Sequence, residues 1–327
     1  MPEPIAPIQN IVVVMLENRS YDNVLGVIGG SGRNGLTGTE SNVDPYTSEP
    51  VTVHEAESNQ IGGSGQTYQA TMLPVIDPNE LFGDMAQQYL GDPAATTPYD
   101  GYTTADGTMS GYMANYKSAR EMSEDNIGDV MTYLTAQQLP VTSFLATNFA
   151  VCDQWFASVP SQTFVNRIFA LCAAPQIANT SAPYSVVNDL DHLVDILTLL
   201  PASDVLETAT ILDQLDAAGQ SWKLYFHDYS IAMLTIPYVA TNPGNVSTFD
   251  NSDWGSSKPF QLPAAPASTF VDDVANGTLP PFSFIEPRYA TNFVEVANQL
   301  PPNSNHPGAA NFPASKDPDP SKPPIDA

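Results

Sequence analysis

The feature that most constrains the fold is a short apolar run near the start of the chain, Ile11-Val12-Val13-Val14-Met15-Leu16. Its apolarity is continuous rather than alternating and it is rich in β-branched residues, so it predicts a strand at 10–16 that is buried on both faces. Strands of this kind belong to α/β sheets that are covered by helices. The run ends abruptly in a carboxylate and a carboxamide, Glu17 and Asn18.

Helical and strand patterns alternate along the rest of the chain. Apolar residues recur at helical spacing in several segments, and two of these helices end at a glycine. The expected helices are 123–138, 189–200, 208–218 and 268–276, and the expected strands are 10–16, 221–228 and 282–285. This order predicts an α/β fold with a central mixed or parallel sheet flanked by helices. A packed apolar segment is expected at 142–151, and long loop-rich insertions at 26–76.

The patterns indicate one domain at 1–300, because no clear linker interrupts them. Residues 301–327 hold eight prolines and almost no apolar period, so this stretch is expected to be a loop or tail. The start of the chain has neither the basic nor the apolar region of a signal peptide. A chain that begins at Met1 would therefore be cytoplasmic, and one that lost a leader would be secreted or periplasmic.

The charge of the chain restricts its partners. The 327 residues include 36 acidic and 10 basic side chains, a formal net charge of -26. This balance argues against nucleic acid as a partner, and it repels anionic substrates unless a local positive charge, most simply a metal ion, attracts them. No stretch approaches the roughly 18 apolar residues of a transmembrane helix. Cys152 and Cys172 are expected to be buried free thiols, with a single disulfide as the alternative.

Two stretches carry residues that suit phosphate chemistry. Ligands of open α/β sheets bind beyond the carboxyl ends of the strands, where Glu17 and Asn18 offer two kinds of oxygen to a hard metal ion. The alternative is that Asn18 and Ser20 cap a helix and Glu17 is solvated. The second stretch, 158–169, predicts a turn and then a helix that begins near Thr163.

A hydroxyl at a helix N-terminus can bind a phosphate, or attack it if a metal ion lowers the pKa of that hydroxyl. The alternative for Thr163 is an ordinary N-cap. Asn166 and Arg167 lie one turn along the expected helix and can donate hydrogen bonds to phosphate oxygens. His227 is expected to support a site or to be purely structural.

Five stretches occur in a fixed order: ENRSYDNVLG, CDQWFASVPSQTFVNRIF, SWKLYFHD, FSFIEPRY and NSNHP. Together they resemble the phosphoesterase family of bacterial and plant non-specific phospholipases C and related acid phosphatases, within the alkaline-phosphatase-like superfamily. The resemblance runs from residue 8 to about residue 308, and its first two motifs are long and specific.

The resemblance implies roles for particular residues. Glu17, Asn18 and Thr163 would bind a divalent metal ion, with calcium, magnesium, manganese, iron and zinc all open. Thr163 would be the nucleophile that forms a phospho-enzyme, and Asn166 would help to hold the phosphoryl group. His306 would contact the phosphate or protonate the leaving oxygen.

Three departures from the family pattern qualify this reading. Many members carry Asp-Pro-Gly-His where this chain has Asp77-Pro78-Asn79-Glu80, and Val165 replaces a proline before Asn-Arg. The family's later motif, similar to Tyr-Asp-Glu-x-Gly-Gly-x-x-Asp-His, does not occur in this sequence. We therefore expect a C-terminally truncated member that lacks part of the metal site and of the sheet, and that is weakly active or inactive alone.

The function that the resemblance implies is hydrolysis of a phosphate ester. The first expectation is a phospholipase C-like cleavage of phosphodiesters such as phospholipids. An acid-phosphatase-type phosphomonoesterase is one alternative. A non-catalytic binding protein with a vestigial site is another, and an acidic structural surface protein is a third.

Overall fold

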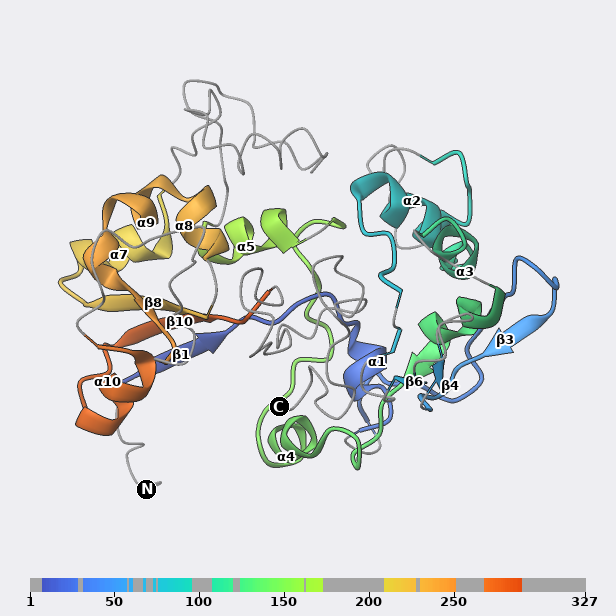
Figure 1. Ribbon diagram of the computed structural model, residues 1–327, viewed down its shortest axis with the longest axis horizontal. Coiled ribbons are helices and arrows are strands. Elements are labelled where there is room, and N and C mark those ends of the chain that lie inside the picture. The colour runs from blue at the N-terminus through green and yellow to red at the C-terminus, as the bar shows by residue number, and fades with distance from the viewer. Residues whose placement is uncertain are drawn as a thin grey trace. The chain divides into compact units, whose positions relative to one another are not determined.

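The computed structural model (Figure 1) describes residues 8–28, 32–57, 59–60, 67–68, 73–74, 76–95, 108–119, 124–161, 163–172, 209–227, 230–250 and 268–289. The predicted helix at 189–200, the tail at 301–327 and His306 lie outside these residues. The chain divides into two compact units. Unit 1 holds Met1–Leu16, Phe164–Ser185 and Leu190–Tyr289, and unit 2 holds Glu17–Thr163, Val186–Asp189 and Ala290–Ala327. The domain boundaries expected from the sequence stay a prediction.

Unit 1 is built on a parallel sheet of four strands in the order β1-β10-β8-β9. The strands are β1 Ile11–Val14, β8 Trp222–Phe226, β9 Val246–Thr248 and β10 Phe282–Glu286. Val13 pairs with Phe284, Phe284 with Leu224, and Leu224 with Val246. Because all four strands are parallel, their carboxyl ends lie at one edge of the sheet.

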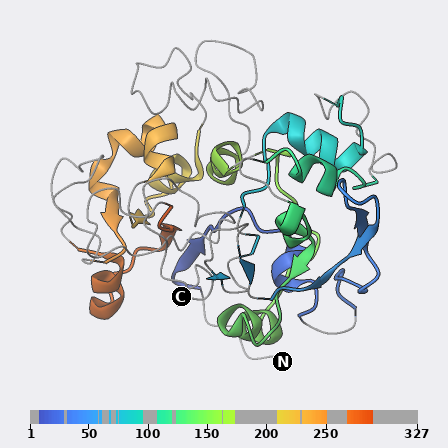
Figure 2. The same ribbon diagram turned by 45° about the vertical axis from the view of Figure 1, so that its right-hand side comes forward.

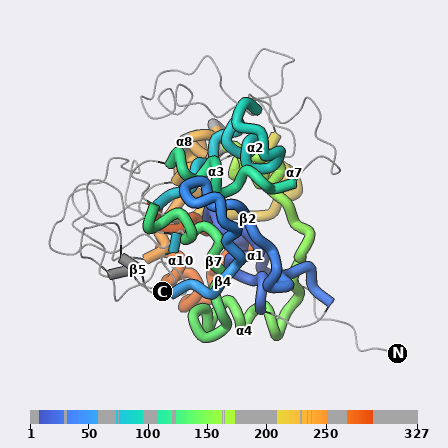
Figure 3. The backbone as a smooth tube through the Cα atoms, turned by 90° about the vertical axis from the view of Figure 1, so that its right-hand side faces the viewer, coloured from blue at the N-terminus to red at the C-terminus, as the bar shows by residue number. Residues whose placement is uncertain are grey.

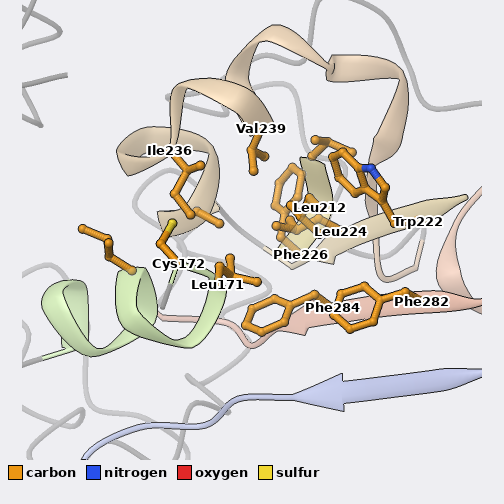
Figure 4. Packing of buried hydrophobic residues seen from close by; sticks show 13 residues of the cluster. Leu171, Cys172, Leu212, Trp222, Leu224, Phe226, Ile236, Val239, Phe282 and Phe284 are labelled. Atoms are coloured by element: carbon orange, nitrogen blue, oxygen red, sulfur yellow. The ribbon is translucent and has the colours of Figure 1, made fainter. Parts of the chain in front are cut away.

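Helices cover both faces of this sheet. They are α5 Thr163–Leu171, α7 Ile211–Ala217, α8 Ile231–Thr235, α9 Pro237–Thr241 and α10 Phe270–Asn276, with a short 3₁₀ helix η3 Pro243–Asn245. Trp222, Leu224 and Phe226 of β8 point into the main core, together with Leu171 at the end of α5 and Cys172, which follows it (Figure 4). The intervening β8 residues face α10 instead. The structure thus confirms an α/β fold with a parallel sheet between helices.

Local signals explain where two of these helices begin and end. The side chain of Thr210 accepts hydrogen bonds at the start of α7, and that of Thr269 does so at the start of α10. Each forms a capping box with an aspartate three residues later. Gly277 ends α10 with φ of 68°, a left-handed conformation that glycine adopts without steric cost. The helices and strands expected between 208 and 285 are therefore confirmed.

The position of β1 differs from the expectation. The strand itself is confirmed, but Ile11, Val12 and Val14 are 42–56% exposed rather than buried on both faces. In the described part of the sheet β1 is an edge strand that pairs with β10 alone. Val13 nevertheless packs against the main core, so one face of the strand is partly covered.

Unit 2 is richer in loops and short elements. Its helices are α1 Tyr21–Leu25, α2 Phe82–Leu90, α3 Tyr112–Tyr116, η2 Glu124–Met131 and α4 Pro140–Asn148. Its strands are β2 Ser41–Val43, β3 Pro50–Thr52, β4 His54–Glu55, β5 Asn59–Gln60, β6 Thr67–Tyr68 and β7 Thr132–Tyr133, paired as β2-β3, β4-β7 and β5-β6. The helices α2 and α3 pack together (Figure 2), and α1 lies beside β7 (Figure 3).

Three expectations for unit 2 are corrected. The helix expected at 123–138 is a 3₁₀ helix that ends at Met131, because the next two residues pair with β4 as a strand. The segment 142–151 is not packed throughout, since Phe144, Leu145 and Phe149 are exposed. Cys152 is an exposed free thiol, whereas Cys172 is buried and free as expected. None of the helices in the described ranges is long and apolar enough to cross a membrane.

Candidate active site

The chain leaves β1 through a sharp turn that presents Glu17 and Asn18. Both side chains are half-buried. Asn18 has φ of 43°, in the left-handed region that asparagine tolerates better than most residues. Its side-chain Nδ2 lies 3.4 Å from Oδ1 of Asp77 as a donor. The amide oxygen of Asn18 is therefore the atom that can serve as a ligand for a cation.

The next residues hold this turn in place within unit 2. Ser20 is the N-cap of α1, and its hydroxyl accepts a hydrogen bond of 3.1 Å from the backbone N–H of Asn23. Of the two residues expected as caps in the alternative interpretation, Ser20 is confirmed and Asn18 is not. The side-chain Nδ2 of Asn23 donates to the carbonyl of Thr132 at 2.8 Å. These bonds fix the start of α1 directly after the Glu17-Asn18 pair.

Arg19 follows Asn18 and bonds to two other residues of unit 2. Its guanidinium donates to Oδ1 of Asn23 at 3.1 Å and to the carbonyl of Leu73. Burial lowers the pKa of Arg19 to about 10, and the nearby Tyr112 and Asp77 act in the opposite direction. The guanidinium therefore stays charged at neutral pH.

Asp77 is a residue that the sequence patterns did not single out for the site. It contacts the side chain of Asn18 and acts on the charge of Arg19. The only signal for it was its place in the Asp77-Pro78-Asn79-Glu80 stretch, which drew notice for a missing histidine. Asp77 adds a carboxylate next to the Glu17-Asn18 turn.

Thr163 is the first residue of α5, as the sequence predicted, and its side chain is half-buried. Free backbone N–H groups and the helix dipole favour an anion at such a position. Asn166 lies one turn further along the same helix and is also half-buried. The placement of Thr163 is compatible with binding or attacking a phosphoryl group, and its role as a nucleophile stays a prediction.

Arg167 occupies the interior of unit 1. Its side chain is 1% exposed, and Nη2 donates to the backbone carbonyl of Met15 at 2.8 Å. Nη1 lies 4.0 Å from Oε1 of Glu286, and the guanidinium carbon lies 5.0 Å from the ring centroid of Tyr289. These contacts join α5 to the residues that follow β1 and end β10. They fit a positioning role for Arg167, while its predicted hydrogen bond to substrate phosphate stays a prediction.

Glu286 completes this buried pair. Its Oε1 accepts hydrogen bonds from the backbone N–H of Ala232 at 3.2 Å and from the Tyr289 hydroxyl at 3.1 Å. Burial raises the pKa of Glu286, and the charge of Arg167 opposes that shift. A buried pair of charged groups is stable only when its geometry and its further hydrogen bonds offset the cost of removing both groups from water.

His227 and Arg288 follow β8 and β10 at the carboxyl edge of the sheet. The imidazole of His227 stacks on Phe249 with ring centroids 4.5 Å apart. Its Nδ1 lies 3.4 Å from Nη2 of Arg288, and both side chains are buried. Because arginine has no acceptor, a hydrogen bond in this contact runs from the guanidinium to Nδ1 of His227. The contacts suit the supporting or structural role that was expected for His227.

By chemical type, three of the candidate residues suit a hard divalent cation in part. Glu17 offers a carboxylate, Asn18 an amide oxygen and Thr163 a hydroxyl, and these are the ligand types that such cations prefer. Within the described ranges, His, Cys, Asp and Glu residues form no group of three that could hold a metal ion. A shell of about six oxygens would therefore need donors beyond these three.

Comparison with known proteins gives consistent relatives. The chain is 28% identical over 303 residues to non-specific phospholipase C1 of Arabidopsis thaliana, covering 92% of this chain and 46% of that protein. It is 30% identical over 223 residues to non-specific phospholipase C4 of the same plant, covering 67% and 36%. It is 25% identical over 292 residues to phospholipase C A of Mycobacterium tuberculosis, covering 88% and 50%. The chain thus spans about half the length of the curated relatives that it matches, or less.

The family match covers more of the chain than any single motif. The model of the phosphoesterase family matches residues 8–316, which include the Glu17-Asn18 turn, α5 and every described strand of the parallel sheet. This agrees with the resemblance carried by the sequence motifs. The chain belongs to the phosphoesterase family.

Proposed function

We propose that this protein hydrolyses phosphate esters by a phospholipase C-type cleavage of phosphodiesters, with Thr163 as its nucleophile. The observation that carries the proposal is the family match over residues 8–316, together with relatives that are named phospholipases C. The placement of Thr163 at the start of α5 and of Glu17 and Asn18 after β1 supports it. A phospholipid is the substrate class that these relatives suggest.

In the proposed reaction, the deprotonated hydroxyl oxygen of Thr163 attacks phosphorus. A bond forms between that oxygen and phosphorus, and the bond from phosphorus to the alcohol oxygen of the lipid breaks. His306 donates a proton to the departing alcohol oxygen. A water molecule then attacks phosphorus and gives a proton back to His306. The bond between phosphorus and the Thr163 oxygen breaks, which releases the phosphorylated headgroup and restores both residues.

Other residues of the chain bind and orient the phosphoryl group. The N–H groups at the start of α5 stabilise the negative charge that grows on its oxygens, and the side-chain amide of Asn166 donates to one of them. A divalent metal ion held by Glu17, Asn18 and Thr163 would supply the positive charge that lowers the pKa of the Thr163 hydroxyl. Arg167 keeps α5 in place against the residues that lead to Glu17.

The test is hydrolysis of two soluble chromogenic substrates, bis(p-nitrophenyl) phosphate and p-nitrophenyl phosphate, by the purified chain with each candidate divalent metal ion. We expect the diester to be cleaved, Thr163→Ala to abolish the cleavage, and Thr163→Ser, which keeps a hydroxyl, to retain part of it. Preference for the monoester would instead favour the phosphatase alternative.

Two results would overturn the proposal. Cleavage that survives Thr163→Ala would exclude Thr163 as the nucleophile. A folded chain that cleaves neither substrate with any of the metal ions would favour the non-catalytic alternative.

A further inference from the structure

The helix α4 of unit 2 has its side chains arranged the opposite way to an ordinary surface helix. Its large apolar residues Val141, Phe144 and Leu145 are exposed, whereas the small residues Ser143 and Ala146 are buried. A helix at the surface of a globular protein normally turns its apolar stripe toward the core. The exposed residues recur at i, i+3 and i+4, so they form a stripe on one face of α4.

Further aromatic residues continue this stripe beyond the helix. We define the aromatic surface by six side chains that are each 51–82% exposed, namely Val141, Phe144, Leu145, Phe149, Trp155 and Phe156. The rings of Phe144 and Phe149 pack edge to face with centroids 6.3 Å apart. Exposed apolar groups of this size that gather in one segment mark a binding surface more often than chance exposure.

Two hydrogen bonds hold the end of α4 near the loop that carries Trp155 and Phe156. Nη2 of Arg33 donates to the carbonyl of Ala146 at 2.6 Å, and the backbone N–H of Asn34 donates to Oδ2 of Asp153 at 2.8 Å. Because Arg33 and Asn34 are adjacent, they tie both segments to one point of unit 2. The helix α4 lies at one end of the described part of this unit (Figures 1 and 3).

The segment that carries the aromatic surface has few charges for this chain. Residues 130–166 contain a single charged side chain, Asp153, whereas the whole chain has 46 charged residues and a net charge of -26. An anionic bilayer repels a protein of this charge. A zwitterionic bilayer does not, and a segment with so few charges can approach it at a small cost in desolvated charge.

We propose that the aromatic surface inserts into the interface of a zwitterionic phospholipid bilayer. Tryptophan and phenylalanine favour the region between headgroups and acyl chains, and a helix with one exposed apolar face can lie in that plane. The proposal rests on the proposed function and extends it, because it places the enzyme on the surface where a phospholipid substrate is found. It concerns binding to the bilayer and not the chemical step.

The test uses the exposed thiol of Cys152, which lies in sequence between Phe149 and Trp155 of the aromatic surface. The other cysteine, Cys172, is buried. A polarity-sensitive fluorophore on Cys152 is titrated with vesicles of phosphatidylcholine and, separately, of phosphatidylglycerol. We expect a blue shift with phosphatidylcholine and a weaker response with phosphatidylglycerol. The double variants Trp155→Ser/Phe156→Ser and Phe144→Ser/Phe149→Ser should each lower the partition coefficient by about tenfold or more.

A matched control removes exposed apolar groups elsewhere. Val271→Ser/Val274→Ser changes two exposed residues of α10 in unit 1 and should leave vesicle binding unchanged. Circular dichroism verifies that each variant is folded. The proposal would be overturned if both aromatic double variants bind vesicles as strongly as the unchanged protein, or if the unchanged protein does not bind phosphatidylcholine vesicles. A second copy of the chain is the occupant if sedimentation shows a dimer that these same variants dissociate.

The two proposals fail in different ways. If the aromatic surface binds lipid, the aromatic variants should lose vesicle binding but keep any hydrolysis of soluble bis(p-nitrophenyl) phosphate. Thr163→Ala should lose hydrolysis but keep vesicle binding. A chain that cleaves the soluble diester and does not bind phosphatidylcholine vesicles would contradict this inference alone.

Discussion

Replacing Arg167 by methionine tests how the carboxyl edge of the sheet is held together. The variant keeps an apolar chain in a site that is 1% exposed, but it removes the charge beside Glu286 and the donor to the Met15 carbonyl. Loss of one partner of a buried ion pair costs about 3–5 kcal/mol, well above the ~1 kcal/mol of a single hydrogen bond. Domains are stabilised by only about 5–15 kcal/mol, so unit 1 should become marginal.

The loss should depend on pH. Burial already raises the pKa of Glu286, and without Arg167 that pKa rises further because an opposing positive charge is gone. A carboxyl group whose folded pKa exceeds its unfolded value destabilises the fold progressively as pH rises from the unfolded pKa through the folded one. The stability deficit of the Arg167→Met variant should therefore be smaller near about pH 5 than near about pH 8.

Urea unfolding at both pH values measures the stability deficit. Unfolding is monitored by far-ultraviolet circular dichroism and by the fluorescence of buried Trp222. The double variant Arg167→Met/Glu286→Gln should recover part of the loss, because it removes the second charge as well. Lys117→Met removes an exposed lysine of unit 2 that donates to the Pro45 carbonyl and lies over the Tyr46 ring, so it should cost no more than about 1 kcal/mol. Equal deficits at the two pH values, or no deficit at all, would refute the reasoning about the buried pair.

Three further predictions concern single residues. Asp273→Asn should destabilise unit 1 by about 2 kcal/mol at neutral pH. Burial raises the pKa of Asp273, but hydrogen bonds from groups that include Lys223 and Tyr225 outweigh burial and lower that pKa to about 2. The stabilising contribution of Asp273 is therefore present above about pH 4 and is lost as pH falls through about 2. Unfolding free energies measured across this acid range test the prediction. Ser20→Ala should cost about 1 kcal/mol in urea unfolding through the lost cap of α1, and Ser20→Asn should not. Asn18→Gly should leave the stability of the turn unchanged, because glycine also adopts a φ of 43°, but it should weaken the binding of a divalent cation measured by calorimetry. Equal binding by the variant would show that Asn18 is not a metal ligand.

Much of unit 1 could be predicted from local patterns. The helix that starts at Thr163, the helix and the strand on either side of Gly277, and the stop at Gly219 follow from spacing and from turn residues, and the structure confirms them. The turn after β1 could be predicted because polar residues end an apolar run. The roles of these residues in catalysis stay predictions.

Other features could not be read from residue types because they depend on distant neighbours. Nothing in the sequence near Arg167 tells that its guanidinium lies against Met15 and Glu286, since these residues are far apart in the chain. Asp77 reaches Asn18 for the same reason. The apolar residues of α4 predicted burial by their type, but the fold turns the opposite face of the helix to the core.

The sequence by itself determined the α/β class, most element positions in unit 1, and the family, since these depend on local periodicity and on motifs. Tertiary structure decided which side of each element is covered. It placed β1 at the edge of the described sheet, made Arg167 part of a buried pair, and left the aromatic face of α4 exposed. The physical reason is that local patterns specify backbone conformation, whereas burial depends on which distant surfaces meet and exclude water.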